Sequence, residues 1–122
     1  MKNNMLGSLC EVVMLPTNGL EDIIKTVNEK YSLREGDPEW FDPDEFWYLF
    51  WCEQEFGTDC YMKIDVSERA IEEEKDWLIE YEGRDETQEY EIYITKARIR
   101  VLEYIRANIP VMIDTVIMPL SY

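Results

Sequence analysis

The stretch EVVMLPTNGLEDIIKTVNEKY, residues 11–31, joins a short β-type segment directly to an amphipathic helix. Residues 11–15 are mostly apolar, and Pro16 ends the segment because proline has no N–H to give to a strand ladder. Thr17 or Asn18 can cap the helix that follows. Its apolar side chains recur at helical spacing, at Leu20, Ile23, Ile24, Val27 and Tyr31. We therefore expect a strand followed at once by a helix.

The same order returns at residues 61–83. Residues 61–66 alternate in polarity and predict a second strand. Ser67 can cap the next helix, and Gly83 can end it. We expect its apolar stripe to face the core, and the stripe consists of Ala70, Ile71, Trp77, Leu78 and Tyr81. The acidic side chains of its outer face are expected to be solvated, and they are Glu72, Glu73, Glu74, Asp76 and Glu80.

A further helix is expected between these two units. Asp42 can cap it, and Pro43 suits its first position. The pattern extends it to about Phe56, with Gly57 as the stop. Because this helix is apolar on nearly every side, we expect it to lie in the core or to be partly covered by a partner.

The last third of the chain contains an ambiguous segment. Residues 90–94 alternate as in a strand, yet apolar side chains from Tyr90 to Asn108 also trace one helical face. A helix is favoured, with its secure part from about Thr95 onward. Pro110 ends it, and residues 111–118 predict the last strand.

The expected order is β-α-α-β-α-α-β in a small single domain, residues 1–122. Strands that are joined through helices favour parallel pairing with right-handed crossovers. The predicted fold class is therefore α/β, with a three-stranded, mainly parallel sheet packed by helices. The alternative is an α+β fold with an extra strand near residues 89–95.

Charge limits the classes of partner. The chain has 27 Asp and Glu, 12 Lys and Arg, and no His, for a formal charge of −15. Phosphate and anionic lipid would repel it, so we expect no direct contact with nucleic acid or membrane and a basic protein as partner. No apolar run approaches the ~20 residues that span a bilayer. Three cysteines fit no zinc or redox spacing, and we expect a cytoplasmic protein.

The negative charge falls in two blocks. Residues 35–59 carry nine acidic side chains and no basic one, and residues 68–91 carry eleven acids and three bases. In the first block the carboxylates alternate with aromatic side chains. In one interpretation the aromatics belong to the core and the acids give solubility. In the other they form a binding face, because carboxylates attract Arg and Lys while aromatics supply contact area.

We expect no enzymatic activity. The sequence has no phosphate-binding glycine loop, nucleophile elbow or metal-ligand spacing, and it lacks the histidine on which much neutral-pH chemistry depends. We therefore predict no catalytic residue, no metal ligand and no cofactor.

The segment PEWFDPDEFWYLF, residues 38–50, resembles the barstar family of intracellular inhibitors of secreted ribonucleases. That family has a Pro-x-aromatic-aromatic segment, a short turn and a helix that opens with Leu-Asp-Ala-Leu-Trp-Asp. Asp44 stands at the first of these aspartates, Trp47 at the tryptophan and Tyr48 at the second aspartate. The resemblance implies three parallel strands, four helices and immunity against a ribonuclease toxin.

We therefore expect a small acidic inhibitor that binds and neutralises a basic partner, such as the nuclease domain of a toxin. Two alternatives stay open: a phage-type anti-defence protein that mimics nucleic acid against a CRISPR or restriction complex, and a non-enzymatic adaptor or oligomer subunit. The expected partner contacts are carboxylates and aromatic anchors. The carboxylates are Asp37, Glu39, Asp42 and Asp44, and the anchors are Trp40, Trp47 and Tyr48.

Overall fold

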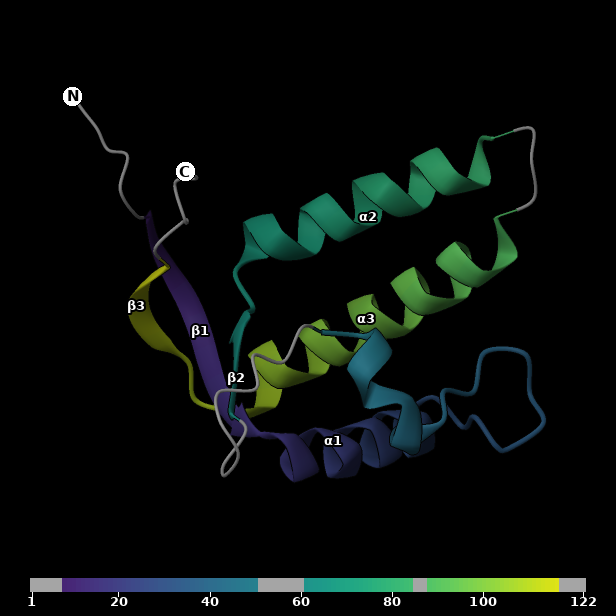
Figure 1. Cartoon of the computed structure of the whole chain (residues 1–122), viewed down its shortest axis with the longest axis horizontal. Helices are drawn as coiled ribbons and strands as arrows, with labels where there is room; N and C mark the ends of the chain where they lie inside the picture. Colours follow the sequence, from purple (N-terminus) through teal and green to yellow (C-terminus); the bar gives the residue numbers. More distant parts are fainter. Residues whose placement is uncertain (1–7, 51–60, 85–87, 117–122) are drawn as a thin grey trace.

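A computed structural model describes residues 8–50, 61–84 and 88–116 of the chain. Its elements are β1 (Ser8–Pro16), α1 (Thr17–Lys30), the 3-10 helix η1 (Pro43–Tyr48), β2 (Tyr61–Asp65), α2 (Glu68–Glu82), α3 (Glu89–Asn108) and β3 (Met112–Val116). The three strands gather at one end, and the helices extend away from them (Figure 1).

The sheet is antiparallel throughout, with the order β2-β1-β3. Val13 of β1 lies opposite Ile64 of β2, and Val12 lies opposite Met112 of β3. The expectation of a mainly parallel sheet is therefore wrong, and with it the barstar-like arrangement of three parallel strands.

The path of the chain explains the antiparallel pairing. The chain leaves the sheet at Pro16 and re-enters it beside the same point, because Pro16 pairs with Tyr61. When the connection between two adjacent strands starts and finishes at the same end of the sheet, the two strands run antiparallel. Since β2 and β3 are each antiparallel to β1, they point the same way, but β1 lies between them. The right-handed crossover rule concerns two parallel strands of one sheet that a helix connects. It does not state whether two strands are adjacent, so it could not predict that β1 lies between β2 and β3.

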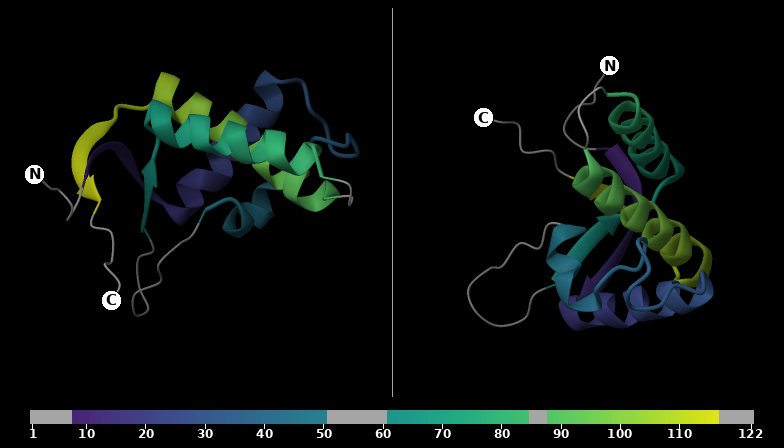
Figure 2. Two further views of the ribbon diagram at one scale, coloured as in Figure 1. Left: turned by 90° about the horizontal axis from the view of Figure 1, so that it is seen from above. Right: turned by 90° about the vertical axis from the view of Figure 1, so that its right-hand side faces the viewer.

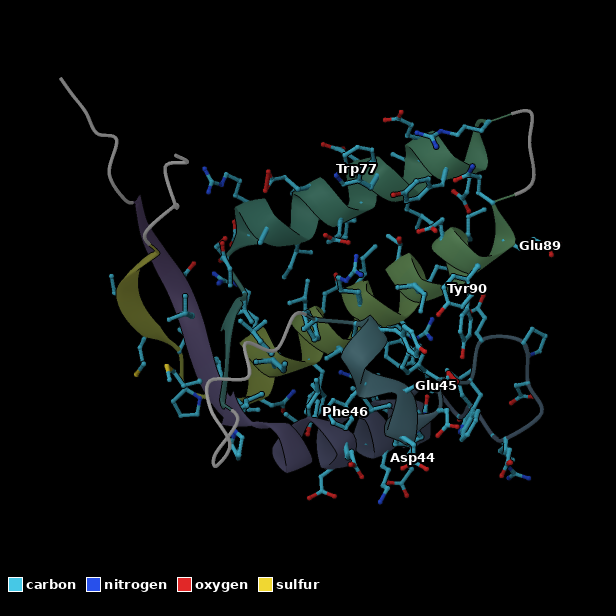
Figure 3. The ribbon with its side chains drawn as sticks, viewed as in Figure 1. Asp44, Glu45, Phe46, Trp77, Glu89 and Tyr90 are labelled. Atoms are coloured by element: carbon cyan, nitrogen blue, oxygen red, sulfur yellow. The ribbon has the colours of Figure 1, made fainter. Side chains whose placement is uncertain are left out.

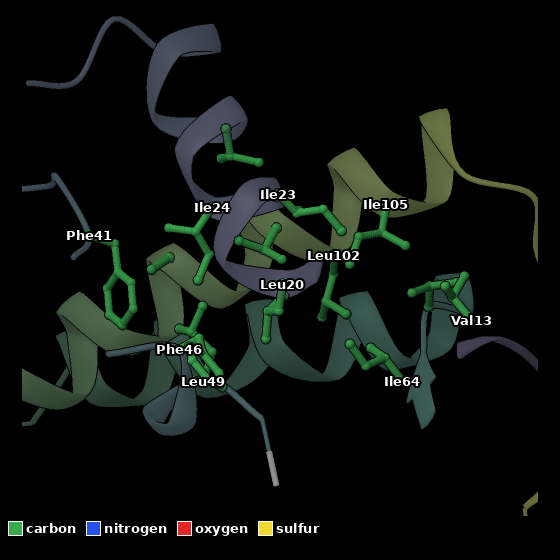
Figure 4. Close-up of a cluster of buried hydrophobic side chains, with 14 of the residues drawn as sticks. Val13, Leu20, Ile23, Ile24, Phe41, Phe46, Leu49, Ile64, Leu102 and Ile105 are labelled. Atoms are coloured by element: carbon green, nitrogen blue, oxygen red, sulfur yellow. The ribbon is translucent and has the colours of Figure 1, made fainter. Parts of the chain in front are cut away.

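The helices lie in layers. α3 occupies the middle, with α2 on one side and α1 with η1 on the other (Figures 1 and 2). The core forms where these layers meet the sheet (Figure 4). Its side chains include Val13, Leu20, Ile24, Phe41, Phe46, Leu49, Ile64, Val66, Val101, Leu102 and Ile105. Both ends of η1 are thereby tied to the core.

Two capping predictions had different outcomes. The Ser67 hydroxyl accepts a hydrogen bond from the Ala70 N–H at 3.1 Å, and Gly83 is the C-cap, which confirms both expected ends of α2. At α1, Pro16 occupies the N-cap position, and it makes no side-chain capping hydrogen bond. The helix begins at Thr17, so neither Thr17 nor Asn18 serves as the expected cap.

α3 begins at Glu89 and continues to Asn108. The extra strand near residues 89–95 is therefore wrong. Ile94, Ala97, Val101 and Ile105 are all buried along one side of the helix. This helical spacing of buried side chains outweighs the local β-propensity of residues 90–94.

The predicted helix from Pro43 to about Phe56 is replaced, in its first part, by the short 3-10 helix η1. Residues 51–56 lie outside the described residues. Phe46 and Leu49 are both buried, at 5% and 2% exposed. In a 3-10 helix, residues three apart lie on the same face, so this geometry directs both side chains into the core.

Candidate functional site

The acidic segment around η1 is held by side chains of α3. The Tyr93 hydroxyl donates to the Trp40 carbonyl at 2.7 Å, and Arg100 Nη2 donates to the Glu39 carbonyl at 2.7 Å. Further along, Arg98 Nε donates to the Leu49 carbonyl at 2.7 Å. The buried Asn28 of α1 binds the backbone of Phe41. Side-chain donors thus fix both ends of residues 39–49, although η1 itself is short.

Glu39 belongs to this support. Its carboxylate forms ion pairs with Lys96 at 3.3 Å and with Arg100 at 3.4 Å, both on α3. The Arg100 side chain is only 12% exposed, and burial lowers the pKa of its guanidinium while Glu39 raises it. Glu39 was expected to contact a partner, but two internal cations already balance its charge.

Asp37 lies in the loop before η1. Its Oδ2 accepts a hydrogen bond from the Arg34 N–H at 2.7 Å, which closes a turn that includes Gly36 at a φ of +103°. A positive φ favours glycine, because a Cβ at that position would strain the backbone. Asp37 is exposed, but it does not line the hollow that Trp40, Asp42 and Asp44 share.

Three of the predicted residues do come together. Trp40, Asp42 and Asp44 line a hollow of about 640 Å³ between α1 and the loop before η1. The rest of its wall consists of Lys25, Asn28, Glu29, Leu33, Glu35 and Pro43. The hollow therefore has four carboxylates and one ammonium group, and it attracts cations.

The start of η1 places carboxylates outward. Asp42 Oδ1 accepts a hydrogen bond from the Asp44 N–H at 2.9 Å and so caps the helix, as predicted. Asp44 and Glu45 are exposed. Within residues 8–50, 61–84 and 88–116, none of these three carboxylates forms an ion pair. Their charge is available to a partner, in contrast to that of Glu39.

Two tyrosines lie beside these carboxylates. Tyr48 is 58% exposed and Tyr90 is 55% exposed, and their rings meet edge to face at 6.5 Å. Partial burial raises the pKa of Tyr90, and Tyr48, Glu45 and Glu91 raise it further. Burial likewise raises the pKa of Tyr93, with added effects of Glu45 and Asp42. The carboxylate of Glu45 therefore acts on both α3 tyrosines.

We define the acidic-aromatic face as Asp42, Asp44, Glu45, Tyr48 and Tyr90, and Figure 3 shows three of these residues, Asp44, Glu45 and Tyr90. Sequence reasoning missed two members. Glu45 could have been found because it follows Asp44 in the first turn of the expected helix. Tyr90 comes from α3, and no local pattern connects it to η1. The side chain of Trp47, another predicted anchor, lies outside the described part of the structure.

Comparison with protein-family models, with curated proteins and with solved structures found no match. Among the described residues, no group of three or more Cys, Asp or Glu side chains is arranged to hold a metal ion. In the same residues, no helix combines the length and apolar character needed to cross a bilayer.

Proposed function

We propose that this chain is a small, non-enzymatic inhibitor that binds a basic partner protein through the acidic-aromatic face. One observation carries the proposal. Glu39 is balanced by Lys96 and Arg100, whereas Asp42, Asp44 and Glu45 have no cationic partner among the described residues. Exposed carboxylates beside exposed tyrosines suit a surface rich in Arg and Lys.

The proposed mechanism is occlusion. Unbalanced carboxylates attract a basic cleft over a distance comparable to the Debye length and accelerate encounter. The Tyr48 and Tyr90 rings then supply rigid contact area with little conformational entropy to lose. The hydrogen bonds from Tyr93, Arg98 and Arg100 reduce the cost of binding further, because the segment is already ordered.

We further propose that the partner is a nuclease toxin of ribonuclease type and that the chain is its immunity protein. This assignment follows from the resemblance of residues 38–50 to the barstar family and from the shape of a nuclease site, which is a basic cleft for phosphate. The sheet gives this assignment no support, because it is antiparallel and the family's sheet is parallel. We also propose a cytoplasmic location, because the chain has an odd number of cysteines at spacings that match no zinc or redox motif.

Affinity capture with the whole chain as bait tests the proposal. We expect a basic nuclease in the captured fraction, identified by mass spectrometry, and inhibition of its activity by the purified chain. The variant Asp44→Asn with Glu45→Gln should bind that partner at least tenfold more weakly, because it removes two unbalanced charges at the contact.

The matched control is Glu21→Gln with Asp22→Asn on α1. It changes the net charge by the same amount, but these residues do not line the acidic-aromatic face. Equal loss in both variants would mean that the partner responds to net charge alone. A captured partner with an acidic surface would contradict the proposal altogether.

The nucleic-acid mimic is a second candidate, since acidic side chains also occupy the far side of the molecule on α2 (Figure 3). A mimic would engage both sides, so single substitutions should have small effects while affinity falls steeply with salt. An inhibitor should instead lose most of its affinity through the acidic-aromatic face.

A further inference from the structure

The outward side of α2 has an exposed aromatic residue in an acidic setting. Trp77 was expected to face the core, but it is 48% exposed. The side chains one turn away on the same helix are acidic or aromatic: Glu73, Glu74, Glu80 and Tyr81. α2 packs against the core through Ile71 and leaves the Trp77 indole half exposed. The exposure of so large an aromatic ring needs an explanation.

The next turn of α2 shows how such a ring is covered. The Trp77 ring stacks on that of Tyr81, with centroids 5.8 Å apart and planes at 25°. Arg84 places its guanidinium carbon 5.2 Å from the Tyr81 ring centroid. Glu80 fixes that guanidinium with an ion pair at 3.0 Å. Tyr81 therefore belongs to an arrangement in which a guanidinium covers the ring and a carboxylate holds that guanidinium in place.

Trp77 has the ring and the carboxylates of this arrangement but no guanidinium. In the described part of the chain no cation lies over its indole, since the cation–aromatic contacts involve Tyr31, Tyr81 and Tyr104. The nearby basic side chains are occupied elsewhere. Lys75 pairs with Glu103, and Arg98 pairs with Glu74.

We propose that the Trp77 face of α2 binds an arginine side chain presented by a basic segment of a partner protein. The guanidinium would stack on the indole, which is the best aromatic partner for a cation, and Glu73 and Asp76 would supply the complementary charge, since Glu80 is already paired with Arg84. Arginine is preferred to lysine because its planar group is weakly hydrated and stacks on rings, as Arg84 does on Tyr81.

This face is separate from the acidic-aromatic face. Trp77 lies on α2, and Asp44 and Glu45 lie on η1, with α3 between the two layers (Figure 3). The proposal therefore concerns a second contact and does not depend on the function proposed for the first. A partner that surrounds the hairpin of α2 and α3 could use both.

An acetylated triarginine amide peptide is the probe, with trilysine as the peptide of equal charge. In a ¹H–¹⁵N spectrum of the whole chain, we expect triarginine to shift the Trp77 indole resonance, which is assigned by its loss in Trp77→Phe. Trp77→Ala should weaken triarginine binding by about two- to fivefold, the range for a cation–aromatic contact at an exposed site. The same substitution should change trilysine binding less.

Ile79→Ala is the matched control, because Ile79 is an apolar residue of the same helix that is 69% exposed. It should leave triarginine affinity unchanged. Circular dichroism verifies that α2 persists in both variants, and alanine favours the helix. A Trp77 indole resonance that stays fixed at peptide saturation would refute the proposal, as would equal triarginine affinities of Trp77→Ala and the unmodified chain.

The variant Asp44→Asn with Glu45→Gln separates the two proposals. It should retain the shift of the Trp77 resonance while it loses capture of the basic partner. If it loses capture and the Trp77 resonance never responds to triarginine, only the further inference fails. If capture is unaffected and the Trp77 resonance does respond, only the function proposed for the acidic-aromatic face fails.

Discussion

Asn28 and Phe41 form a two-sided hydrogen-bonded pair across 13 positions of the chain. The Asn28 amide nitrogen donates to the Phe41 carbonyl at 2.8 Å, and its amide oxygen accepts from the Phe41 N–H at 3.3 Å. The Asn28 side chain thus imitates a neighbouring strand. Both residues are buried, at 4% and 2% exposed. These two hydrogen bonds attach the loop that precedes η1 to α1.

We predict that Asn28→Ala lowers the free energy of unfolding by about 1–3 kcal/mol, because it leaves a buried N–H and a buried carbonyl without their partners. Urea denaturation measures the change. Asn108→Ala is the control, since Asn108 is exposed and, among the described residues, its side chain donates only to the Tyr104 carbonyl within its own helix. It should change stability by less than about 0.5 kcal/mol. Equal losses of stability in Asn28→Ala and Asn108→Ala would show that the two buried hydrogen bonds with Phe41 stabilise the fold no more than the exposed one of Asn108.

Arg98 gives a second prediction, on how η1 is fixed to the helical layers. Its guanidinium donates to Glu74 at 2.7 Å and to the Leu49 carbonyl at 2.7 Å. Arg98→Ala should lower the free energy of unfolding by about 1.5–3 kcal/mol, the range for hydrogen bonds to charged groups. Arg98→Lys should recover only part of it, because an ammonium group cannot reproduce the planar fork.

A double-mutant cycle with Glu74→Gln separates the Glu74 contact of Arg98 from its contact with the Leu49 carbonyl. If the Leu49 carbonyl contributes independently of the ion pair, Arg98→Ala should still destabilise a chain that already carries Glu74→Gln. Additive effects of the two substitutions would indicate that Arg98 and Glu74 do not interact measurably.

Tyr93 predicts a dependence of stability on alkaline pH. Burial, Glu45 and Asp42 raise its pKa above the ordinary value of about 10. The folded state therefore favours the protonated phenol, which donates to the Trp40 carbonyl. Its contribution is complete below the unfolded pKa and is lost as pH rises through the folded pKa. At pH 7, Tyr93→Phe should lower the free energy of unfolding by about 0.5–1.5 kcal/mol.

That difference between Tyr93→Phe and the unmodified chain should shrink above about pH 10, as the tyrosine ionises. Urea titrations at neutral and alkaline pH measure it. Tyr104→Phe is the control, because within the described residues the Tyr104 hydroxyl forms no hydrogen bond; its contact is the Lys30 ammonium near its ring. A constant difference for Tyr93→Phe across this range would exclude the linkage.

The acidic-aromatic face predicts a kinetic division of roles in partner binding. Asp44→Asn with Glu45→Gln should lower the association rate constant and weaken its dependence on salt, since these charges act at a distance. Tyr48→Ala should mainly raise the dissociation rate constant, because contact area is lost only after docking. Surface plasmon resonance at several ionic strengths measures both constants. A Tyr48→Ala effect confined to association would contradict this division.

Local patterns in the sequence predicted much of the fold. The Ser67 cap, the Gly83 stop and the strand that pairs through residues 61–65 all depend on neighbours within a few positions. The direction of the strands was predicted wrongly, because polarity alternation identifies a strand but not its partner. Pro16 meeting Tyr61 is a contact across 45 positions, and no local pattern encodes it.

The candidate site shows the same division. Capping by Asp42 followed from its position before Pro43. The internal role of Glu39 did not, because Lys96 and Arg100 are 57 and 61 residues away along the chain. These two cations lie four positions apart on α3, so both point toward the same neighbour. The sequence showed that residues 35–59 contain no basic side chain. It could not show that α3 places Lys96 and Arg100 beside Glu39.

The central position of β1 has a consequence for synthesis. Val12 needs Asp65 on one side and Met112 on the other. A ribosome makes β1 before β3, which follows about a hundred residues later, so β1 lacks one neighbour while the residues between them are synthesised. A nascent chain that ends before Met112 exposes an unpaired strand edge next to Val12, which is a template for misassociation. A chain that stops before Met112 should therefore have a lower soluble yield, although it still contains all of η1 and α2.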